Sequence, residues 1–312
     1  MWDAKRARIT EFLTTKLTEP TQLRYQAAAT LFGSWCATQG LNFDPLPLDE
    51  QDLALGDYGL DLRQQDLPLQ NFRDAVAAVQ KRFSGRTFKT AWKVITNWQK
   101  EKPPHQVPPM SQDILSAMVV VLLAGGQTDA AMATLLCFTG MMRISEALKL
   151  VWSDLIVTPT GCILVLRLTK TGPRQQVSIN NAVVTNFVLA HRGRKKDSAP
   201  ICGMTYAVFR RLFLQALRAL GCHTLGFKSH SLRRGGATAR LIAGHTLSQI
   251  MVDGRWSSEA SCRLYLKSVE AQLLLAKRAT DEKAMQRVRL LSELWPCFVS
   301  GDNMSLLLPL QA

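Results

Sequence analysis

Four prolines within eight residues, at 102–109 (KPPHQVPP), constrain the fold of this chain more than any other feature. Proline cannot continue a helix or donate a backbone hydrogen bond, so such a stretch favours an extended connector. The sequence therefore predicts two domains, residues 1–102 and 111–289, joined by a linker at 103–110 and followed by a tail at 290–312. A length of 312 residues suits two domains of roughly 100–200 residues each.

The segments before the linker have helical periodicity. Apolar side chains recur every three or four residues at 20–39, 68–83 and 87–100. Residues 44–66 hold seven acids against Arg63 alone, and we expect an acidic loop there. Because no strand pattern precedes residue 103, the first domain is predicted to be a small helical bundle.

The second domain begins with two expected helices. Ser111 is a candidate N-cap for the first, which should end at Gly125-Gly126, and the second should cover 129–138. Strand composition follows at 151–157, 162–169 and 175–179, with a hairpin turn at 170–173. Helices are expected again at about 205–220, 230–243, 246–253 and 257–279. The predicted fold class is mainly α, with a mostly helical second domain that carries a small antiparallel β-sheet.

The charge points to a polyanionic partner. The chain has 38 Lys and Arg against 24 Asp and Glu, a net charge of +14 and a pI near 9.8. Residues 1–102 contribute +2 (14 basic, 12 acidic) and the remainder +12 (24 basic, 12 acidic). Nucleic acid is the first candidate partner for such a chain.

Cysteine usage and hydropathy indicate the cellular compartment of the protein. Seven cysteines are scattered without a C-x-x-C pair, so neither a disulfide framework nor a zinc ribbon is indicated. The longest apolar run, residues 118–124, is far shorter than the ~20 residues that span a bilayer. The first residues lack the apolar stretch of a signal peptide. The sequence predicts an intracellular, DNA-associated protein without a membrane partner, nuclear if the host has a nucleus.

Several polar residues stand out because secondary-structure propensity does not explain them. Arg143 and Glu146, like His230 and Arg233, are spaced to share one face of a helix. Lys170 is expected at the tip of the hairpin. Each of these features alone is more often structural: a surface ion pair, or a solvated lysine.

Two aromatic residues complete the set. Trp256 is expected in a loop (GRWSS), and Tyr265 follows nine residues later. A lone tyrosine on a helix is usually part of the core. Taken together, the order and separation of all these residues favour a functional site over separate structural roles.

The joint pattern resembles the tyrosine recombinase (phage integrase-like) family, in the branch with Trp at the second His/Trp position. The resemblance rests on TGMMRISEALKL, LTKTGPRQQVSI, HSLRRGGAT, GRWSS and YL, and it covers about residues 111–280. It implies that residues 1–102 form a core-binding domain that contacts DNA and that residues 111–289 form the catalytic domain. Met141-Met142 replaces a more usual Gly-Leu or Ala-Leu, a mild departure.

The resemblance also implies the roles of the site residues. Tyr265 would attack a DNA phosphodiester and become linked to the 3′ phosphate. Lys170 would protonate the leaving 5′ oxygen, and Glu146 would orient the site from behind. The non-bridging oxygens would be held by Arg143, Arg233, His230 and Trp256.

Elementary chemistry supports these roles. Guanidinium groups stabilise the charge that develops on equatorial phosphate oxygens, without a metal. An alkoxide leaves poorly unless it receives a proton, which a lysine can supply. A covalent phosphotyrosine conserves the bond energy, so rejoining needs no ATP. No phosphate-binding Gly-rich loop and no metal-binding carboxylate cluster occurs in the sequence, and no cofactor or metal site is expected.

Two further basic segments are candidates for DNA contacts. The helix expected at 87–100 places Arg86, Lys89, Lys93 and Lys100 partly on one side, with Trp92, Val94, Ile95 and Trp98 toward the bundle. The basic run consists of Arg192, Arg194, Lys195 and Lys196, and suits phosphate contacts or nuclear import. Solvated surfaces are the alternative in both cases.

The tail is apolar at 290–298 and 306–310. By analogy with the family, it would dock on a neighbouring subunit of a homo-tetramer on double-stranded DNA. We expect deletion of 291–312 to weaken assembly and to spare DNA binding by the monomer. Packing of the tail on its own domain is the alternative.

Three functions remain open at this point. The first is a site-specific recombinase or integrase of a mobile element. The second is a type IB topoisomerase, against which His230-x-x-Arg233 and the short first domain argue. The third is a catalytically silent DNA-binding protein derived from a recombinase, against which the complete residue set argues.

Overall fold

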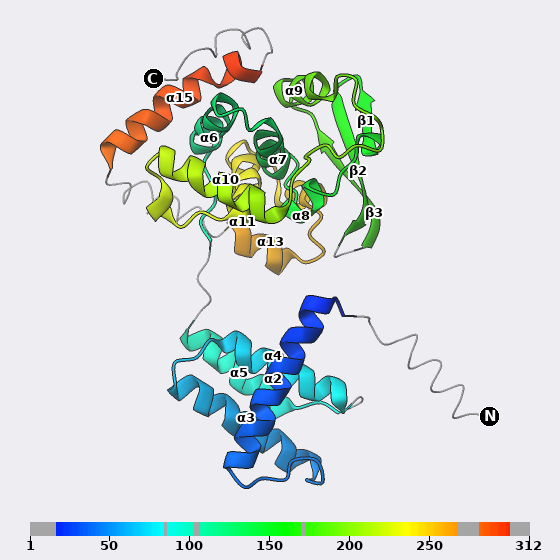
Figure 1. The fold of residues 1–312 in the computed structure, drawn as a ribbon, viewed down its shortest axis with the longest axis vertical. Helices are drawn as coiled ribbons and strands as arrows, with labels where there is room; N and C mark the ends of the chain where they lie inside the picture. The colour runs from blue at the N-terminus through cyan, green and yellow to red at the C-terminus, as the bar shows by residue number, and fades with distance from the viewer. Residues whose placement is uncertain (1–16, 84–85, 103–106, 170–171, 267–280, 300–312) are drawn as a thin grey trace, which may run out of the picture. The chain divides into compact units, whose positions relative to one another are not determined.

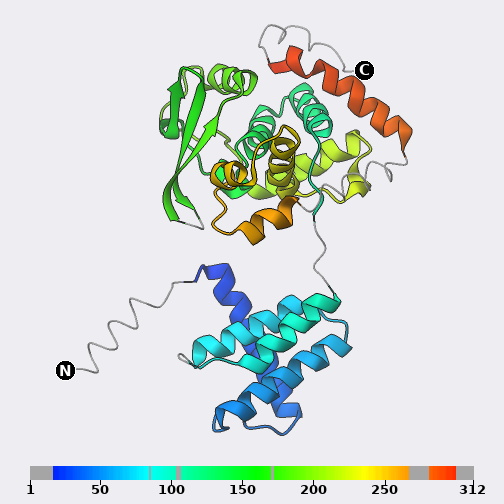
Figure 2. The same ribbon diagram turned by 180° about the vertical axis from the view of Figure 1, so that it is seen from behind.

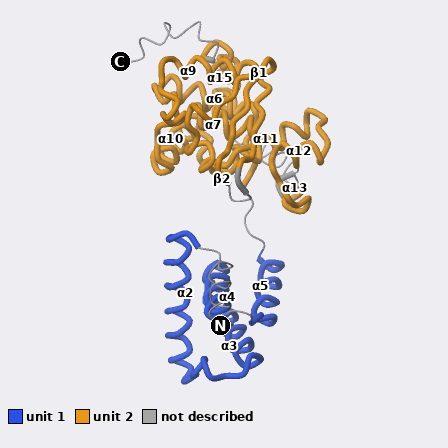
Figure 3. Tube along the Cα trace, turned by 90° about the vertical axis from the view of Figure 1, so that its right-hand side faces the viewer, with its two compact units in different colours: residues 1–105 blue, residues 106–312 orange. Residues whose placement is uncertain are grey.

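The computed structural model describes residues 17–83, 86–102, 107–169, 172–266 and 281–299. The chain divides into two compact units, Met1–His105 and Gln106–Ala312 (Figure 3). The division falls inside the stretch predicted to be a linker. The fold class is confirmed: both units are helical, and the second carries a three-stranded antiparallel sheet.

The first unit is a bundle whose helices are α2 (Glu19–Thr38), α3 (Leu48–Gln64), α4 (Leu69–Arg82) and α5 (Lys89–Glu101). Three of them occupy the predicted segments. The prediction of an acidic loop at 44–66 is wrong, because α3 occupies most of this segment. Leu55, Tyr58 and Leu62 are buried at helical spacing along α3, while most of its acidic side chains occupy the opposite, exposed face.

Buried contacts fix the helices of the first unit to one another. Asp52 of α3 accepts the backbone N–H groups of Thr90 and Ala91 at 2.7 and 2.9 Å, and so caps the start of α5. Arg24 of α2 makes two hydrogen bonds to the carboxylate of Asp74 on α4, at 2.8 and 3.0 Å. Phe72 is fully buried at the centre of the aromatic core.

Two almost fully buried helices, α6 (Gln112–Ala124) and α7 (Thr128–Thr139), form the centre of the second unit (Figure 1). Their buried faces are lined by Ile, Leu, Met, Val and Ala. Ser111 caps α6 as expected, because its side chain accepts the Ile114 N–H at 3.4 Å. The other helices of the second unit surround α6 and α7, and the sheet lies to one side of them.

The sheet has the order β1-β2-β3, with β1 (Leu155–Thr158), β2 (Gly161–Thr169) and β3 (Gly172–Ile179). Leu164 of β2 pairs with Leu155 of β1 and with Val177 of β3. The first strand begins later than the predicted residue 151, because Trp152–Asp154 forms a 3-10 turn around the buried Trp152. A helix that was not predicted, α9 (Ala182–Arg192), follows the sheet.

The remaining helices of the second unit are α8 (Ile144–Ala147), α10 (Tyr206–Ala219), α11 (Ser229–Ile242), α12 (Leu247–Gly254), α13 (Glu259–Leu266) and α15 (Glu282–Val299). Figure 2 shows α11, α12 and α13 from the side hidden in Figure 1. None of the helices in the described ranges is long and apolar enough to cross a membrane.

The described part of the tail packs on its own domain. α15 lies along α6 and buries Val288 completely (Figure 1). Leu291, Trp295 and Phe298 join the same hydrophobic core. This is the alternative stated for the tail, and it holds for residues up to 299; residues 300–312 lie outside the described part.

Candidate active site

Arg143 stands at a sharp turn between α7 and the sheet. Gly140 ends α7, and Met141 has a φ of +44°, a left-handed conformation uncommon for residues other than glycine. Arg143 then precedes α8. Its backbone N–H donates to Glu146 Oε2 at 2.9 Å, and its Nη1 donates to Glu146 Oε1 at 2.6 Å. The Arg143 side chain nevertheless stays 25% exposed, so part of its guanidinium faces outward.

A second arginine, which the sequence pattern did not single out, contacts the same carboxylate. Arg255 lies between α12 and α13, and its Nη2 donates to Glu146 Oε2 at 2.8 Å. The side chains of Arg255 and Glu146 are only 6% and 5% exposed. One buried carboxylate therefore holds two guanidinium groups. The sequence signal for Arg255 is weak, since it consists only of an arginine directly beside Trp256.

Arg233 connects the turn after α7 to the end of α12. It lies one turn after His230 on α11 and is 1% exposed. Its Nη1 donates to the carbonyl oxygen of Met141, and its Nη2 donates to that of Gly254 at 2.6 Å. The ring of Trp256 covers the guanidinium, with 4.5 Å between Cζ and the ring centroid, a distance typical of a cation–π contact.

Two glycines allow this close packing. A Cβ on Gly236 would lie 2.0 Å from the carbonyl oxygen of Phe138, so α11 can approach the end of α7 only where the side chain is absent. A Cβ on Gly254 would lie 1.8 Å from the ring of Trp256. Gly236 therefore lets α11 approach the end of α7, and Gly254 lets the Trp256 ring pack against the end of α12.

The charges in the site set the protonation of its members. Burial acts to raise the pKa of Glu146, but hydrogen bonds from Arg143 and the charge of Arg255 outweigh it and leave the pKa below its ordinary value. Loss of contact with water and the positive charges of Arg233 and Arg143 lower the pKa of His230. At neutral pH Glu146 is therefore ionised and His230 is neutral, so His230 can accept a proton.

The other two predicted residues are Tyr265 and Lys170. Tyr265 belongs to α13, nine residues after Trp256, but its side chain lies outside the described part of the chain. Lys170 lies outside the described residues, between the end of β2 at Thr169 and the start of β3 at Gly172. Of the seven predicted residues, the structure brings five together: Arg143, Glu146, His230, Arg233 and Trp256.

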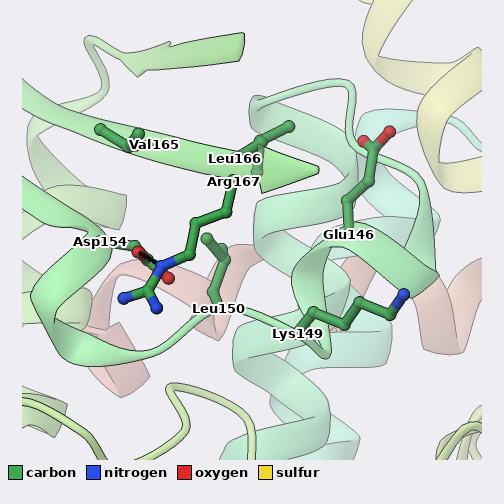
Figure 4. Close-up of a pocket in the computed structure, with 7 residues that line it drawn as sticks. All are labelled: Glu146, Lys149, Leu150, Asp154, Val165, Leu166 and Arg167. Atoms are coloured by element: carbon green, nitrogen blue, oxygen red, sulfur yellow. Dashed lines mark hydrogen bonds and ion pairs between the residues drawn. The ribbon is translucent and has the colours of Figure 1, made fainter. Parts of the chain in front are cut away.

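A pocket of about 230 Å³ opens beside this cluster, toward the sheet. Arg167 Nε donates to Asp154 Oδ1 at 2.7 Å within it. In Figure 4 the carboxylate of Glu146 points away from Arg167 and Lys149. Of the residues in the cluster, only Glu146 lines this pocket. Within the described ranges, no three His, Cys, Asp or Glu side chains gather in a way that could hold a metal ion.

The basic face predicted on α5 is present in part. Lys89, Lys93 and Lys100 are exposed at spacings of four and seven residues, which place them on one face. The prediction that Trp92 packs toward the bundle is wrong: it is 39% exposed, and its Nε1 donates to Gln80 Oε1 at 2.9 Å. Its position next to Lys93 puts it at the edge of the basic face.

Three of the other basic candidates, Arg86, Arg192 and Lys195, have polar partners within their own unit. Arg86 donates to Gln51 Oε1 at 2.5 Å. Arg192 pairs with Asp197 at 2.7 Å, and Lys195 Nζ lies 2.9 Å from His191 Nε2. Arg194 and Lys196 are exposed in the loop after α9.

Solved structures with the same fold cover most of the chain. The integrase of transposon Tn1549, bound to transposon right end DNA, is 13% identical with a TM-score of 0.57, and the match covers 87% of this chain and 98% of that one. A lambda integrase dimer bound to a COC′ core site is 13% identical with a TM-score of 0.53, and the match covers 85% and 94%. These likenesses show the fold. No curated protein matches the chain.

The model of the phage integrase family matches residues 110–272, slightly more than half of the chain. The matched range contains the Arg143 turn, the sheet, α11 and α13, and thus all seven residues of the predicted constellation. The chain belongs to the phage integrase family, whose members are the tyrosine site-specific recombinases.

Proposed function

We propose that this protein breaks and rejoins double-stranded DNA through a covalent bond between Tyr265 and a 3′ phosphate. The Tyr265 phenol oxygen attacks the phosphorus, and the bond between phosphorus and the 5′ oxygen breaks. His230 accepts the phenol proton, and Lys170 donates a proton to the departing 5′ oxygen. Rejoining reverses these steps with the 5′ hydroxyl of another strand, and neither a metal nor ATP takes part.

The observation that carries this proposal is that Arg143, His230, Arg233 and Trp256 lie together, beside the buried Glu146 carboxylate that holds Arg143. His230 lies one turn before Arg233 on α11, and the charges of Arg233 and Arg143 contribute to lowering its pKa. Arg143 is more exposed than Arg233 and would contact a non-bridging oxygen directly. Arg233 would complete the positive potential beneath the phosphate. Such preorganised charge stabilises the transition state of phosphoryl transfer.

The DNA would be held by basic residues of both units. Lys89, Lys93 and Lys100 of α5 supply an exposed row of charges, which suits contacts along a phosphate backbone. Further contacts would come from Arg86, Arg192, Arg194, Lys195 and Lys196. The solved integrases with this fold are bound to DNA, which supports the same partner here. From the family we infer that the protein assembles as a homo-tetramer on DNA. We infer that this assembly integrates or excises a mobile element.

The experiment that tests the proposal traps the covalent intermediate. Cleavage of nicked duplexes of pooled random sequence releases a short fragment that carries the free 5′ hydroxyl, so rejoining is prevented and the protein remains attached to the 3′ phosphate. The protein and a Tyr265→Phe variant are compared on a denaturing gel. We expect a DNA-shifted band for the protein and none for the variant, and sequencing the trapped DNA gives the target site.

Two outcomes would contradict the proposal. A band of equal strength in Tyr265→Phe would assign the nucleophile to another residue. Tight binding in a gel shift without a covalent band, on the pool and on DNA flanking the gene, would indicate a binding protein without cleavage. Relaxation of supercoiled DNA without a specific site would instead identify a topoisomerase.

A further inference from the structure

Arg255 occupies a position that is unfavourable for an arginine in two respects. Its φ of +57° lies in the left-handed region, where a Cβ is crowded by the backbone. Its side chain is 6% exposed, so the guanidinium has lost most of its hydration. A residue persists in such a conformation only when its surroundings hold it there, and such residues cluster at functional sites.

The group that holds Arg255 is the carboxylate that also holds Arg143. Glu146 Oε2 accepts from Arg255 Nη2 at 2.8 Å and from the backbone N–H of Arg143 at 2.9 Å. The carbonyl oxygens of Gly140 and Met141 each lie 3.5 Å from the same guanidinium. Within the described part of the chain, the side-chain hydrogen bonds of Arg255 therefore go to residues 140–146, the segment that carries Arg143.

The neighbours of Arg255 in the sequence bind a different part of the site. The Gly254 carbonyl accepts from Arg233 at 2.6 Å, and the Trp256 ring covers the same guanidinium at 4.5 Å. α13, which contains Tyr265, begins only four residues after Arg255. Three consecutive residues thus connect the start of the nucleophile's helix to Arg143 on one side and to Arg233 on the other.

We propose that Arg255 is a positioning residue that fixes Trp256 and the start of α13 against the Arg143–Glu146 pair. It acts through Glu146 and the loop and does not contact the DNA. Without this link, the loop is still held by Arg233 but can shift relative to Arg143. Displacements of about 1 Å in an active site can reduce rates about 100-fold. This inference rests on the proposed function, because it concerns the geometry of that reaction.

The conformation of Arg255 itself provides a discriminating variant. Arg255→Gly removes the guanidinium but suits a φ of +57°, so relief of backbone strain offsets part of the lost ion pair. Arg255→Lys keeps a charge that can reach Glu146 and serves as the conservative variant. The matched control is Arg240→Gln. Arg240 joins α11 to the Thr139 carbonyl at 3.0 Å and to Asp253 of α12 at 3.5 Å, without contacting Glu146.

Three quantities are measured for each variant: melting temperature, DNA affinity by gel shift, and the single-turnover rate of covalent complex formation on the nicked pool. For Arg255→Gly we expect affinity within about threefold of the parent and a rate about 100-fold lower. Arg255→Lys should recover part of the rate. Arg240→Gln should lower the melting temperature, and at a temperature where it is folded its rate should stay within about threefold.

Two results would overturn the positioning role. One is an Arg255→Gly rate close to that of the parent. The other is an equal loss of rate in folded Arg240→Gln, which would reduce Arg255 to a general packing contact. Failure of the proposed function looks different: the parent protein then forms no covalent complex, and the role of Arg255 falls with it.

Discussion

His230 is the residue whose protonation should govern the pH dependence of cleavage. Its pKa is lowered below the ordinary value of 6.5 by loss of contact with water and by the charges of Arg233 and Arg143. Above that pKa the ring is neutral and can accept the phenol proton. Glu146, whose pKa is also lowered, stays ionised across the same range.

We therefore expect the single-turnover cleavage rate to fall on acidification, with a midpoint below pH 6.5. A His230→Gln variant cannot titrate at this position, so its rate should be lower by about 10²–10⁴-fold and should lack this acid limb. Circular dichroism at each pH checks that both proteins stay folded. A midpoint above 6.5, or the same acid limb in the variant, would contradict the assignment.

At the scale of single residues, the sequence predicted most of the site but not Arg255. Arg143 and Glu146 are three residues apart and form the predicted pair, although Arg143 precedes α8 as its N-cap and only Glu146 lies in the helix. Arg255 and Glu146 are 109 residues apart, and only the fold brings them together. The close approach of α11 to α7 at Gly236 is likewise encoded by no local periodicity.

At the scale of helices, prediction from the sequence is limited in a similar way. α6 has a serine cap and a glycine stop, and both ends were predicted correctly. α3 has the same helical spacing of buried residues, but seven acids and two glycines in and around it resemble a loop. Asp52, which accounts for one of these acids, is buried because it caps α5. A charge whose partner is the start of another helix cannot be recognised from its own segment.

The exposed row on α5 leads to a prediction about this helix. If Lys93 contacts a phosphate, Lys93→Gln should lower DNA affinity and reduce the slope of log affinity against log salt by about 0.9. Lys283 is exposed on α15, outside the proposed contacts, so Lys283→Gln makes the same change of charge elsewhere. Gel shifts at several salt concentrations measure both slopes. Equal slopes for the two variants would remove α5 from the DNA interface.

At the scale of the whole molecule, the tail contains two parts, and a single deletion would remove both at once. Leu291, Trp295 and Phe298 of α15 pack on the hydrophobic core of the second unit, whereas residues 300–312 follow this helix in the sequence. Deleting 291–312 would therefore remove core contacts together with any docking segment. A chain ending at residue 299 keeps the core contacts and tests docking alone.

We expect the chain ending at 299 to melt like the full chain and to bind DNA as a monomer with unchanged affinity, but to assemble less on DNA in light scattering. The chain ending at 290 should melt at a lower temperature, because apolar side chains that pack on the core are lost. Assembly of the 299 chain equal to that of the full chain would show that 300–312 has no part in it. The subunit contacts of the proposed tetramer would then be expected from the two folded units.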